Sequence, residues 1–75
     1  MKKYVIIESI GTWTVDKGRT VIDCTVKEQH IIAESNDFME VFTNTPKSVE
    51  YRKDGTWHSY SYDSRKSAKR MLGIK

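Results

Sequence analysis

Cysteine, proline and long apolar runs are scarce in this chain of 75 residues. Its only cysteine, Cys24, has no partner for the internal disulfide that small secreted domains commonly need, so we expect a reducing, cytoplasmic location. The apolar run behind Met1 is interrupted at Glu8, too early for a signal peptide, and no segment approaches the roughly 20 apolar residues of a membrane span. The sequence predicts a single domain, residues 1–75, with no membrane partner.

Residues that could carry catalysis or hold a metal are also lacking. A structural zinc site needs about four Cys or His ligands, and the chain has only Cys24, His30 and His58. The four glycines stand apart, which excludes a glycine-rich phosphate loop, and the acidic residues are scattered over predicted turns and strands. We therefore expect a protein that is not an enzyme and that uses no cofactor and no metal.

The chain does have a basic C-terminal segment. Residues 65–75 hold five of the 13 basic side chains and no acidic one, so their net charge is about +5. The other eight basic and ten acidic side chains give the rest of the chain a net charge of about −2. Asp63 or Ser64 provides an N-cap and Gly73 a C-terminal stop for a short helix. Its apolar side comprises Ala68, Met71 and Leu72, and an adjoining basic arc comprises Arg65, Lys66, Lys69 and Arg70. We expect the apolar side to lie on a sheet and the basic arc to face an anionic partner.

The first third of the chain predicts strands at residues 4–10, 12–16 and 19–26. A two-residue turn at Lys17-Gly18 pairs Val15 with Thr20 and Trp13 with Ile22. In this register Trp13, Val15, Ile22, Cys24 and Val26 share one face, and we expect Trp13 and Cys24 on it to be buried.

Residues 28–43 fit two interpretations. Two strands, at 30–33 and 38–43, can flank a turn at Ser35-Asn36-Asp37. A helix also fits, because Ile31, Ile32, Phe38, Met39 and Phe42 fall near one helical face. The turn-forming pair Asn36-Asp37 favours the strands, and both interpretations stay open.

Residues 48–62 predict a hairpin around Asp54-Gly55, read as a two-residue turn. This register places Arg52 opposite Trp57 on a polar, exposed face, whereas a three-residue loop would place Tyr51 beside Trp57. With the two-residue turn, Arg52, Lys53 and Trp57 form a second candidate contact for nucleic acid or protein. Together the elements predict an α+β, mainly β fold: a single antiparallel, curled β-sheet of five to six strands with one short C-terminal α-helix packed on it.

Residues 64–69, Ser-Arg-Lys-Ser-Ala-Lys, resemble the opening of the second helix in double-stranded-RNA-binding domains. The resemblance implies that Arg65, Lys66 and Lys69 contact phosphates across a groove. It is local, because no helix precedes the predicted sheet and the Gly-x-His loop of that family is absent.

Two functions therefore compete. The first is a nucleic-acid-binding module that uses the basic helix together with the hairpin residues. The second is a small inhibitor or regulator of the phage or mobile-element type, docked on an acidic or nucleic-acid-binding surface of a host complex such as a nuclease or a CRISPR complex. A homodimer formed through a sheet edge or the Trp57 face is a third possibility.

Overall fold

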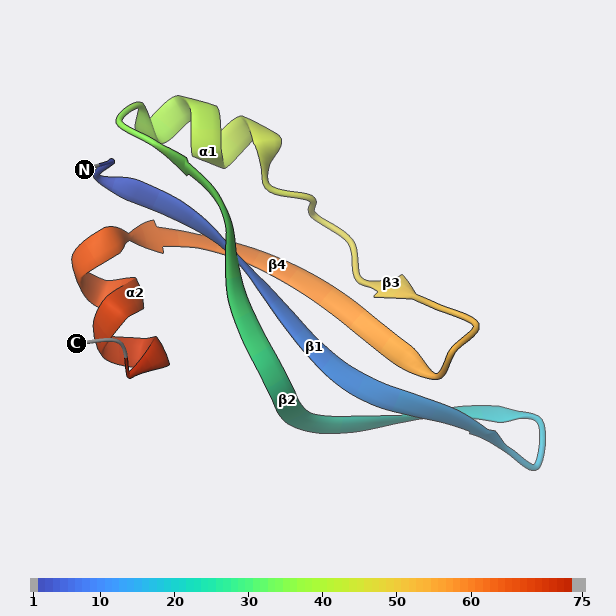
Figure 1. The fold of residues 1–75 in the computed structure, drawn as a ribbon. Helices are drawn as coiled ribbons and strands as arrows, with labels where there is room; N and C mark the ends of the chain where they lie inside the picture. The colour runs from blue at the N-terminus through green and yellow to red at the C-terminus, as the bar shows by residue number, and fades with distance from the viewer. Residues whose placement is uncertain (1, 74–75) are drawn as a thin grey trace.

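A computed structural model describes residues 2–73, which form one antiparallel sheet with a helix on each face (Figure 1). The elements are β1 (Tyr4–Asp16), β2 (Arg19–Ser35), α1 (Phe38–Asn44), β3 (Glu50–Tyr51), β4 (Thr56–Ser64) and α2 (Arg65–Leu72). The strands lie in the order β2-β1-β4-β3. The mainly β fold with a C-terminal helix is thus confirmed, with four strands instead of five to six and with α1 as an additional helix.

The first strand continues through Gly11, where the sequence predicted a break. β1 pairs with β4 from Tyr4↔Ser64 to Thr12↔Thr56 without a register shift. Gly11 is needed there because the Trp57 ring lies directly over it: a Cβ on Gly11 would be 2.2 Å from Cε2 of that ring. The indole crosses β1 and donates from Nε1 to the carbonyl of Asp23 on β2, at 3.0 Å. Glycine here permits a close approach within the strand and does not end it.

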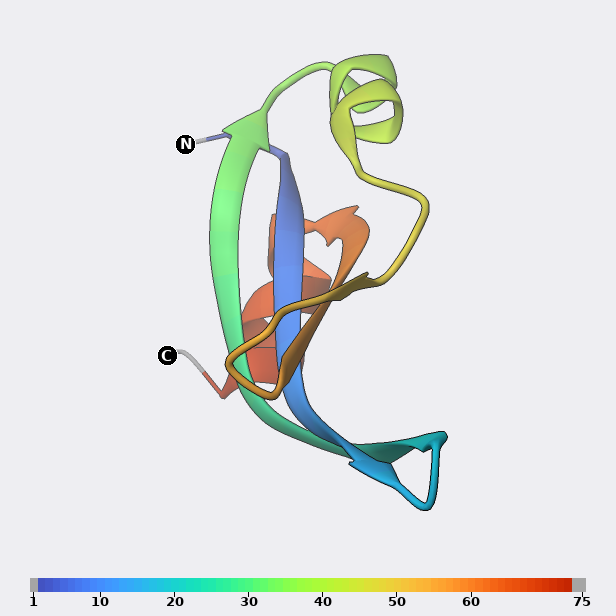
Figure 2. The ribbon, with the colours of Figure 1, turned by 90° about the vertical axis from the view of Figure 1, so that its right-hand side faces the viewer.

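The hairpin of β1 and β2 has the predicted turn and register. Lys17 and Gly18 have φ angles of 51° and 77°, as a type I′ turn requires, and Trp13 pairs with Ile22. Farther along, the pairing shifts between Ile6 and Ile7 and again between Ile10 and Thr12. Such irregularities bend a strand, and Figure 2 shows the end of the hairpin bending away from the rest of the sheet.

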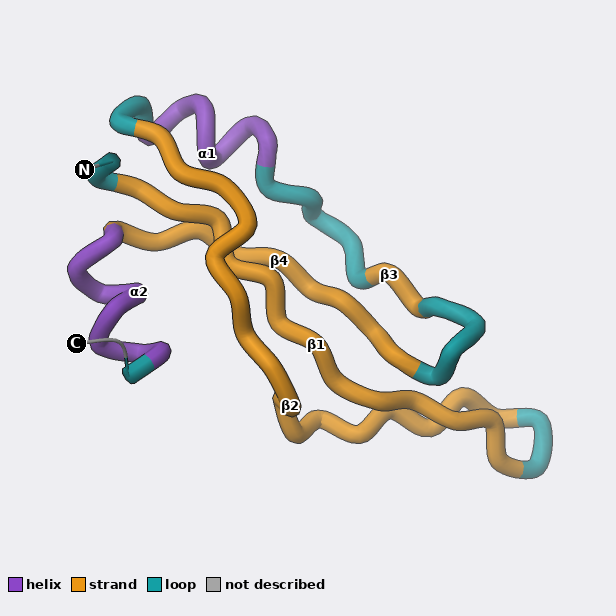
Figure 3. Tube along the Cα trace, in the orientation of Figure 1, coloured by secondary structure: helices purple, strands orange, loops and turns teal. Residues whose placement is uncertain are grey.

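The middle segment combines the two interpretations (Figure 3). β2 continues to Ser35, so the strand predicted at 30–33 is confirmed, whereas the strand predicted at 38–43 is wrong because α1 occupies those residues. Asp37 is the N-cap of α1 and accepts from the backbone N–H of Met39 at 3.0 Å. Glu40, three residues after the cap, accepts from the Ser35 hydroxyl at 2.9 Å. Asn36-Asp37 therefore starts a helix and does not reverse a hairpin.

The hairpin of β3 and β4 has a three-residue loop, so its predicted register is wrong by one residue. Tyr51 pairs with Trp57, and the backbone N–H of Arg52 donates to the carbonyl of Thr56 at 2.8 Å. Gly55, with φ of 88°, completes a turn in which its N–H donates to the carbonyl of Arg52 at 3.1 Å. A shift of one residue moves side chains to the other face, and Trp57 is accordingly 8% exposed.

Both helices cover the same end of the sheet. On one face Ala68 of α2 packs with Val5 and Ile7, and all three are fully buried. On the opposite face, Phe38 of α1 contacts the rings of Tyr4 and Tyr62 edge-on, at centroid distances of 5.5 and 5.4 Å. The far end of the β1–β2 hairpin projects beyond both helices (Figure 1).

The helix α2 begins and ends as predicted. Ser64 is its N-cap and accepts from the backbone N–H of Ser67 at 3.3 Å, and Gly73 is left-handed with φ of 72°. Ala68 is buried as expected, whereas Met71 is 52% exposed. Lys75, part of the predicted basic segment, lies outside the described residues. Within residues 2–73 no helix has the length and apolar character to cross a membrane.

Candidate nucleic-acid interface

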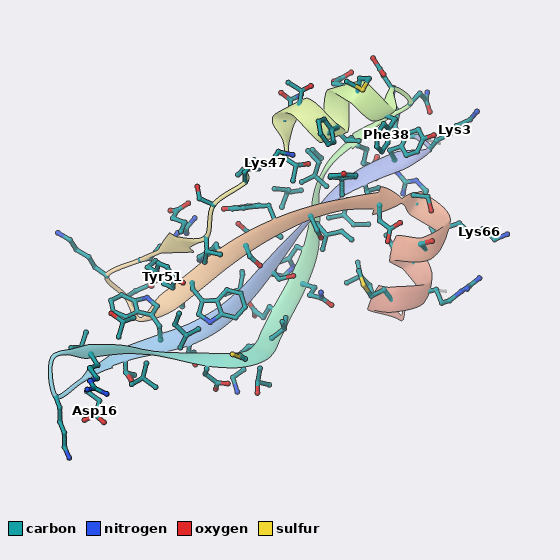
Figure 4. All side chains as sticks on the ribbon, turned by 180° about the vertical axis from the view of Figure 1, so that it is seen from behind. Lys3, Asp16, Phe38, Lys47, Tyr51 and Lys66 are labelled. Atoms are coloured by element: carbon teal, nitrogen blue, oxygen red, sulfur yellow. The ribbon has the colours of Figure 1, made fainter. Side chains whose placement is uncertain are left out.

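Basic residues from both ends of the chain meet beside α2. The backbone N–H of Arg65 donates to the carbonyl of Lys3 at 2.8 Å, and its Nε donates to the carbonyl of Lys2 at 2.7 Å. Figure 4 shows Lys3 and Lys66 at one end of the molecule, with Asp16 and Tyr51 toward the other. We call the resulting surface the basic end, which comprises Lys2, Lys3, Arg65, Lys66, Lys69 and Arg70.

The basic end is concave. An open hollow of about 430 Å³ is lined by Lys2, Lys3, Ser64, Arg65, Lys66 and Lys69. An adjoining hollow of about 380 Å³ is lined by Lys2, Glu34, Asn36 and Arg65. Only Glu34 among these lining residues is acidic, so an anion here meets several cations and one opposing charge.

Arg65 already has partners within the protein. Its guanidinium forms an ion pair with Glu34 of β2, and its side chain is only 17% exposed. The helix N-terminus is also partly satisfied, because the backbone N–H groups of Arg65 and Ser67 donate to the carbonyl of Lys3 and the hydroxyl of Ser64. Contacts to an anion would therefore come mainly from the ammonium groups of Lys2, Lys3 and Lys66 and from Arg70.

The structure does not place the hairpin residues as predicted. Trp57 is buried and presents no ring face to a base, and Arg52 forms an ion pair with Glu50, with Nε and Oε1 3.0 Å apart. Lys53 is exposed in the β3–β4 loop, which lies at the opposite end of the sheet from α2 (Figure 1). The predicted second contact of Arg52, Lys53 and Trp57 is therefore not assembled, and these residues do not join the basic end.

A partly buried polar row on the face opposite α2 was not predicted from the sequence. His58, 6% exposed, places Nδ1 3.1 Å from Oε2 of Glu8 and Nε2 3.2 Å from Oγ1 of Thr56. Partial burial raises the pKa of Glu8, but the interactions with His58 and Tyr60 lower it by more, so that carboxyl has a pKa below its ordinary value. Burial raises the pKa of the Tyr60 hydroxyl, and its hydrogen bond to the Glu8 carboxylate raises it further. The row joins β1 to β4 and lies on the other face of the sheet from the basic end.

The interactions of Glu8 predict that the folded state loses stability in acid as this carboxyl becomes protonated. Because the folded-state pKa of Glu8 is lowered, its contribution is present above the unfolded value near 4.5 and is lost as pH falls through the folded value. We expect Glu8→Gln to lower the urea midpoint at about pH 7. Between about pH 5 and pH 3 the urea midpoint of this variant should fall less than that of the parent chain. Glu28→Gln is the matched control, because that side chain is 62% exposed. If Glu8→Gln and Glu28→Gln changed the pH dependence of the urea midpoint equally, Glu8 would not be the source of the acid sensitivity.

Other candidate groups do not add a site. Cys24 is exposed, which corrects the expectation that it is buried. Among residues 2–73 no three His, Cys, Asp or Glu side chains come together as metal ligands.

A scan against protein-family models, a search of curated proteins and a search of solved structures found no match for this chain. The geometry of the basic end is therefore the best indication of function.

The contribution of Lys2 and Lys3 was missed from the sequence. Their adjacency is visible in the sequence, but their place beside α2 depends on the pairing of Tyr4 with Ser64. That pairing brings the start of β1 to the end of β4, immediately before the helix.

Proposed function

We propose that this chain is a non-catalytic, cytoplasmic binding protein whose basic end engages the phosphate backbone of nucleic acid. The observation that supports the proposal is the convergence of Lys2 and Lys3 with Lys66 and Lys69 around a concave surface with a single acidic residue, Glu34. Lysine ammonium groups are point charges on flexible stems and bind phosphate without requiring a fixed orientation.

The same surface argues for contacts to the backbone and against reading of base sequence. No aromatic side chain lines either hollow, so bases have no stacking partner there. Phosphate contacts carry no sequence information, and each neutralised phosphate of duplex DNA adds about 0.9 to the slope of log affinity against log salt. We therefore expect binding that is strongly dependent on salt and weakly dependent on sequence.

The experiment compares two double charge reversals with equal net charge. Lys66→Glu with Lys69→Glu removes two cations from α2, whereas Lys17→Glu with Arg19→Glu removes two cations at the turn of the β1–β2 hairpin. Anisotropy with labelled duplex DNA, duplex RNA and single strands, between about 50 and 200 mM salt, should show that the α2 variant loses at least about tenfold in affinity and about two units of salt slope. The hairpin variant should bind nearly as the parent chain does.

Equal losses in both variants would indicate a response to net charge alone and would contradict a defined interface. No binding of the parent chain at low salt would contradict the proposal and leave the alternative, a regulator docked on an acidic surface of a nuclease or CRISPR complex. That alternative lacks the aromatic anchor expected of Trp57, which is buried, so nucleic acid is the better supported partner.

A further inference from the structure

The end of the sheet farthest from α2 is a single layer. The helix α1 contacts β1 and β2, and α2 contacts β1 and β4, but both lie at the end of the sheet that carries Tyr4 and Ser64 (Figure 1). Domains normally bury a sheet face against a second layer, so the uncovered end lacks a partner layer.

The uncovered end carries an apolar surface on the same face as α2. Trp57 marks that face, because it pairs with Gly11 two positions along β1 from Trp13 and opposite Tyr51 of β3. We call the surface the distal patch, which comprises Trp13, Val15, Ile22, Cys24, Val49 and Tyr51. Val15 is 65% exposed, Tyr51 47%, Val49 43% and Ile22 41%. An open groove of about 230 Å³ crosses it, and none of its lining residues (Ile22, Cys24, Val49, Tyr51, Trp57 and Ser59) is charged.

Hydrogen bonds and a ring contact within the protein fix the side chains of the distal patch. Trp13 Nε1 donates to the carbonyls of Arg52 and Thr56, at 2.9 and 2.8 Å, and the Trp13 ring packs edge-on against Tyr51 at 6.1 Å. Trp57 forms part of the floor and donates inward to Asp23. Because both indole N–H groups are already satisfied, the two tryptophans need no polar partner from outside. A surface fixed in advance loses little conformational entropy when it is covered.

The chain also exposes more surface than a compact monomer of its mass. Its accessible surface is 5516 Å², against about 4,700 Å² expected for a folded monomer of 8.7 kDa. Its radius of gyration is 14.1 Å, against about 11.4 Å for a compact domain of this length. The excess area of about 800 Å² equals what one partner contributes to an interface of standard size.

We infer that the distal patch docks a second copy of this chain, with the two sheets packed face to face about a two-fold axis. An uncharged apolar patch is complementary to itself, as a two-fold interface requires, and it offers no charge to select an acidic or basic partner. With the two-fold axis perpendicular to the long axis of the molecule, which is 47 Å long, the basic ends point in opposite directions and stay far apart. Like-charge repulsion therefore does not oppose the dimer.

The test uses the full chain and two variants of neighbouring strand residues. Ile22 belongs to the distal patch, whereas Val21, 47% exposed, points to the opposite face of the same strand. At about 100 μM, light scattering or sedimentation should give twice the mass of 8.7 kDa for the parent chain and for Val21→Lys, and 8.7 kDa for Ile22→Lys. Circular dichroism verifies that each variant is folded.

A monomeric parent chain at that concentration would overturn the inference and leave the patch to a different partner. Masses above two copies, or equal disruption by Val21→Lys, would overturn it as well. The thiol of Cys24 gives a second readout that needs no variant, because it lines the groove. Its alkylation rate should fall at least about fivefold from a dilution at which the chain is monomeric to about 100 μM protein, and a constant rate across that range would contradict burial in a dimer. The result is independent of nucleic-acid binding, because the basic end is not altered.

Discussion

Gly11→Val is expected to lower the free energy of unfolding by about 3 kcal/mol or more, out of about 4–11 kcal/mol for a domain of this length. The new side chain would start 2.2 Å from Cε2 of Trp57, so the indole must leave its place over β1. Its displacement exposes a buried aromatic ring and breaks the hydrogen bond to the carbonyl of Asp23. Strand propensity alone predicts the opposite sign, because valine is favoured over glycine in strands by up to about 1 kcal/mol.

Urea denaturation followed by circular dichroism measures the effect, and a double-mutant cycle assigns its cause. In a Trp57→Leu background the ring is absent, so Gly11→Val should then cost less by at least about 1 kcal/mol. The same loss in both backgrounds would show that the cost does not come from the contact with Trp57.

Ile7→Ala is expected to lower the free energy of unfolding by about 2–5 kcal/mol, the range for such truncations in a core. Ile7 is fully buried and packs in the cluster with Val5 and Ala68, through which α2 rests on the sheet. Truncation leaves a cavity under the helix, and the basic end, which depends on the position of α2, should bind anions more weakly as well.

Ile32→Ala is the matched control for that truncation. Ile32 lies where the pairing of β2 with β1 shifts, is 49% exposed, and should cost less than about 1 kcal/mol when shortened. Thermal and urea unfolding of both variants, followed by circular dichroism, gives the comparison. If Ile7→Ala and Ile32→Ala lowered the free energy of unfolding equally, the packing of α2 on Ile7 would not be the main source of stability at that end.

Local patterns in the sequence predicted the features that depend on a few neighbouring residues. The turn at Lys17-Gly18, the cap at Ser64 and the stop at Gly73 follow from conformational preferences of short segments, and the structure confirms all three. The loop at Asp54-Gly55 was harder, because two- and three-residue loops share the same residues. The longer loop lets Trp57 cover Gly11, a contact between strands that no local pattern predicts.

The helix α1 and the basic end are two further features that the sequence did not predict. Asp37 followed by Glu40 is a helix-start pattern, but the turn preference of Asn36-Asp37 was given more weight. The contribution of Lys2 and Lys3 to the site depends on which strand lies beside β1, and strand order is a property of the whole sheet.

The pairing of Tyr4 with Ser64 has a consequence for the order of folding. The β1–β2 hairpin closes across two residues, between Asp16 and Arg19, whereas β4 must reach β1 across almost the entire chain. Contacts between distant residues require a costly loop closure and form late. We therefore expect the basic end to be among the last parts of the molecule to assemble, so that nascent or partly folded chains carry its charges without its shape.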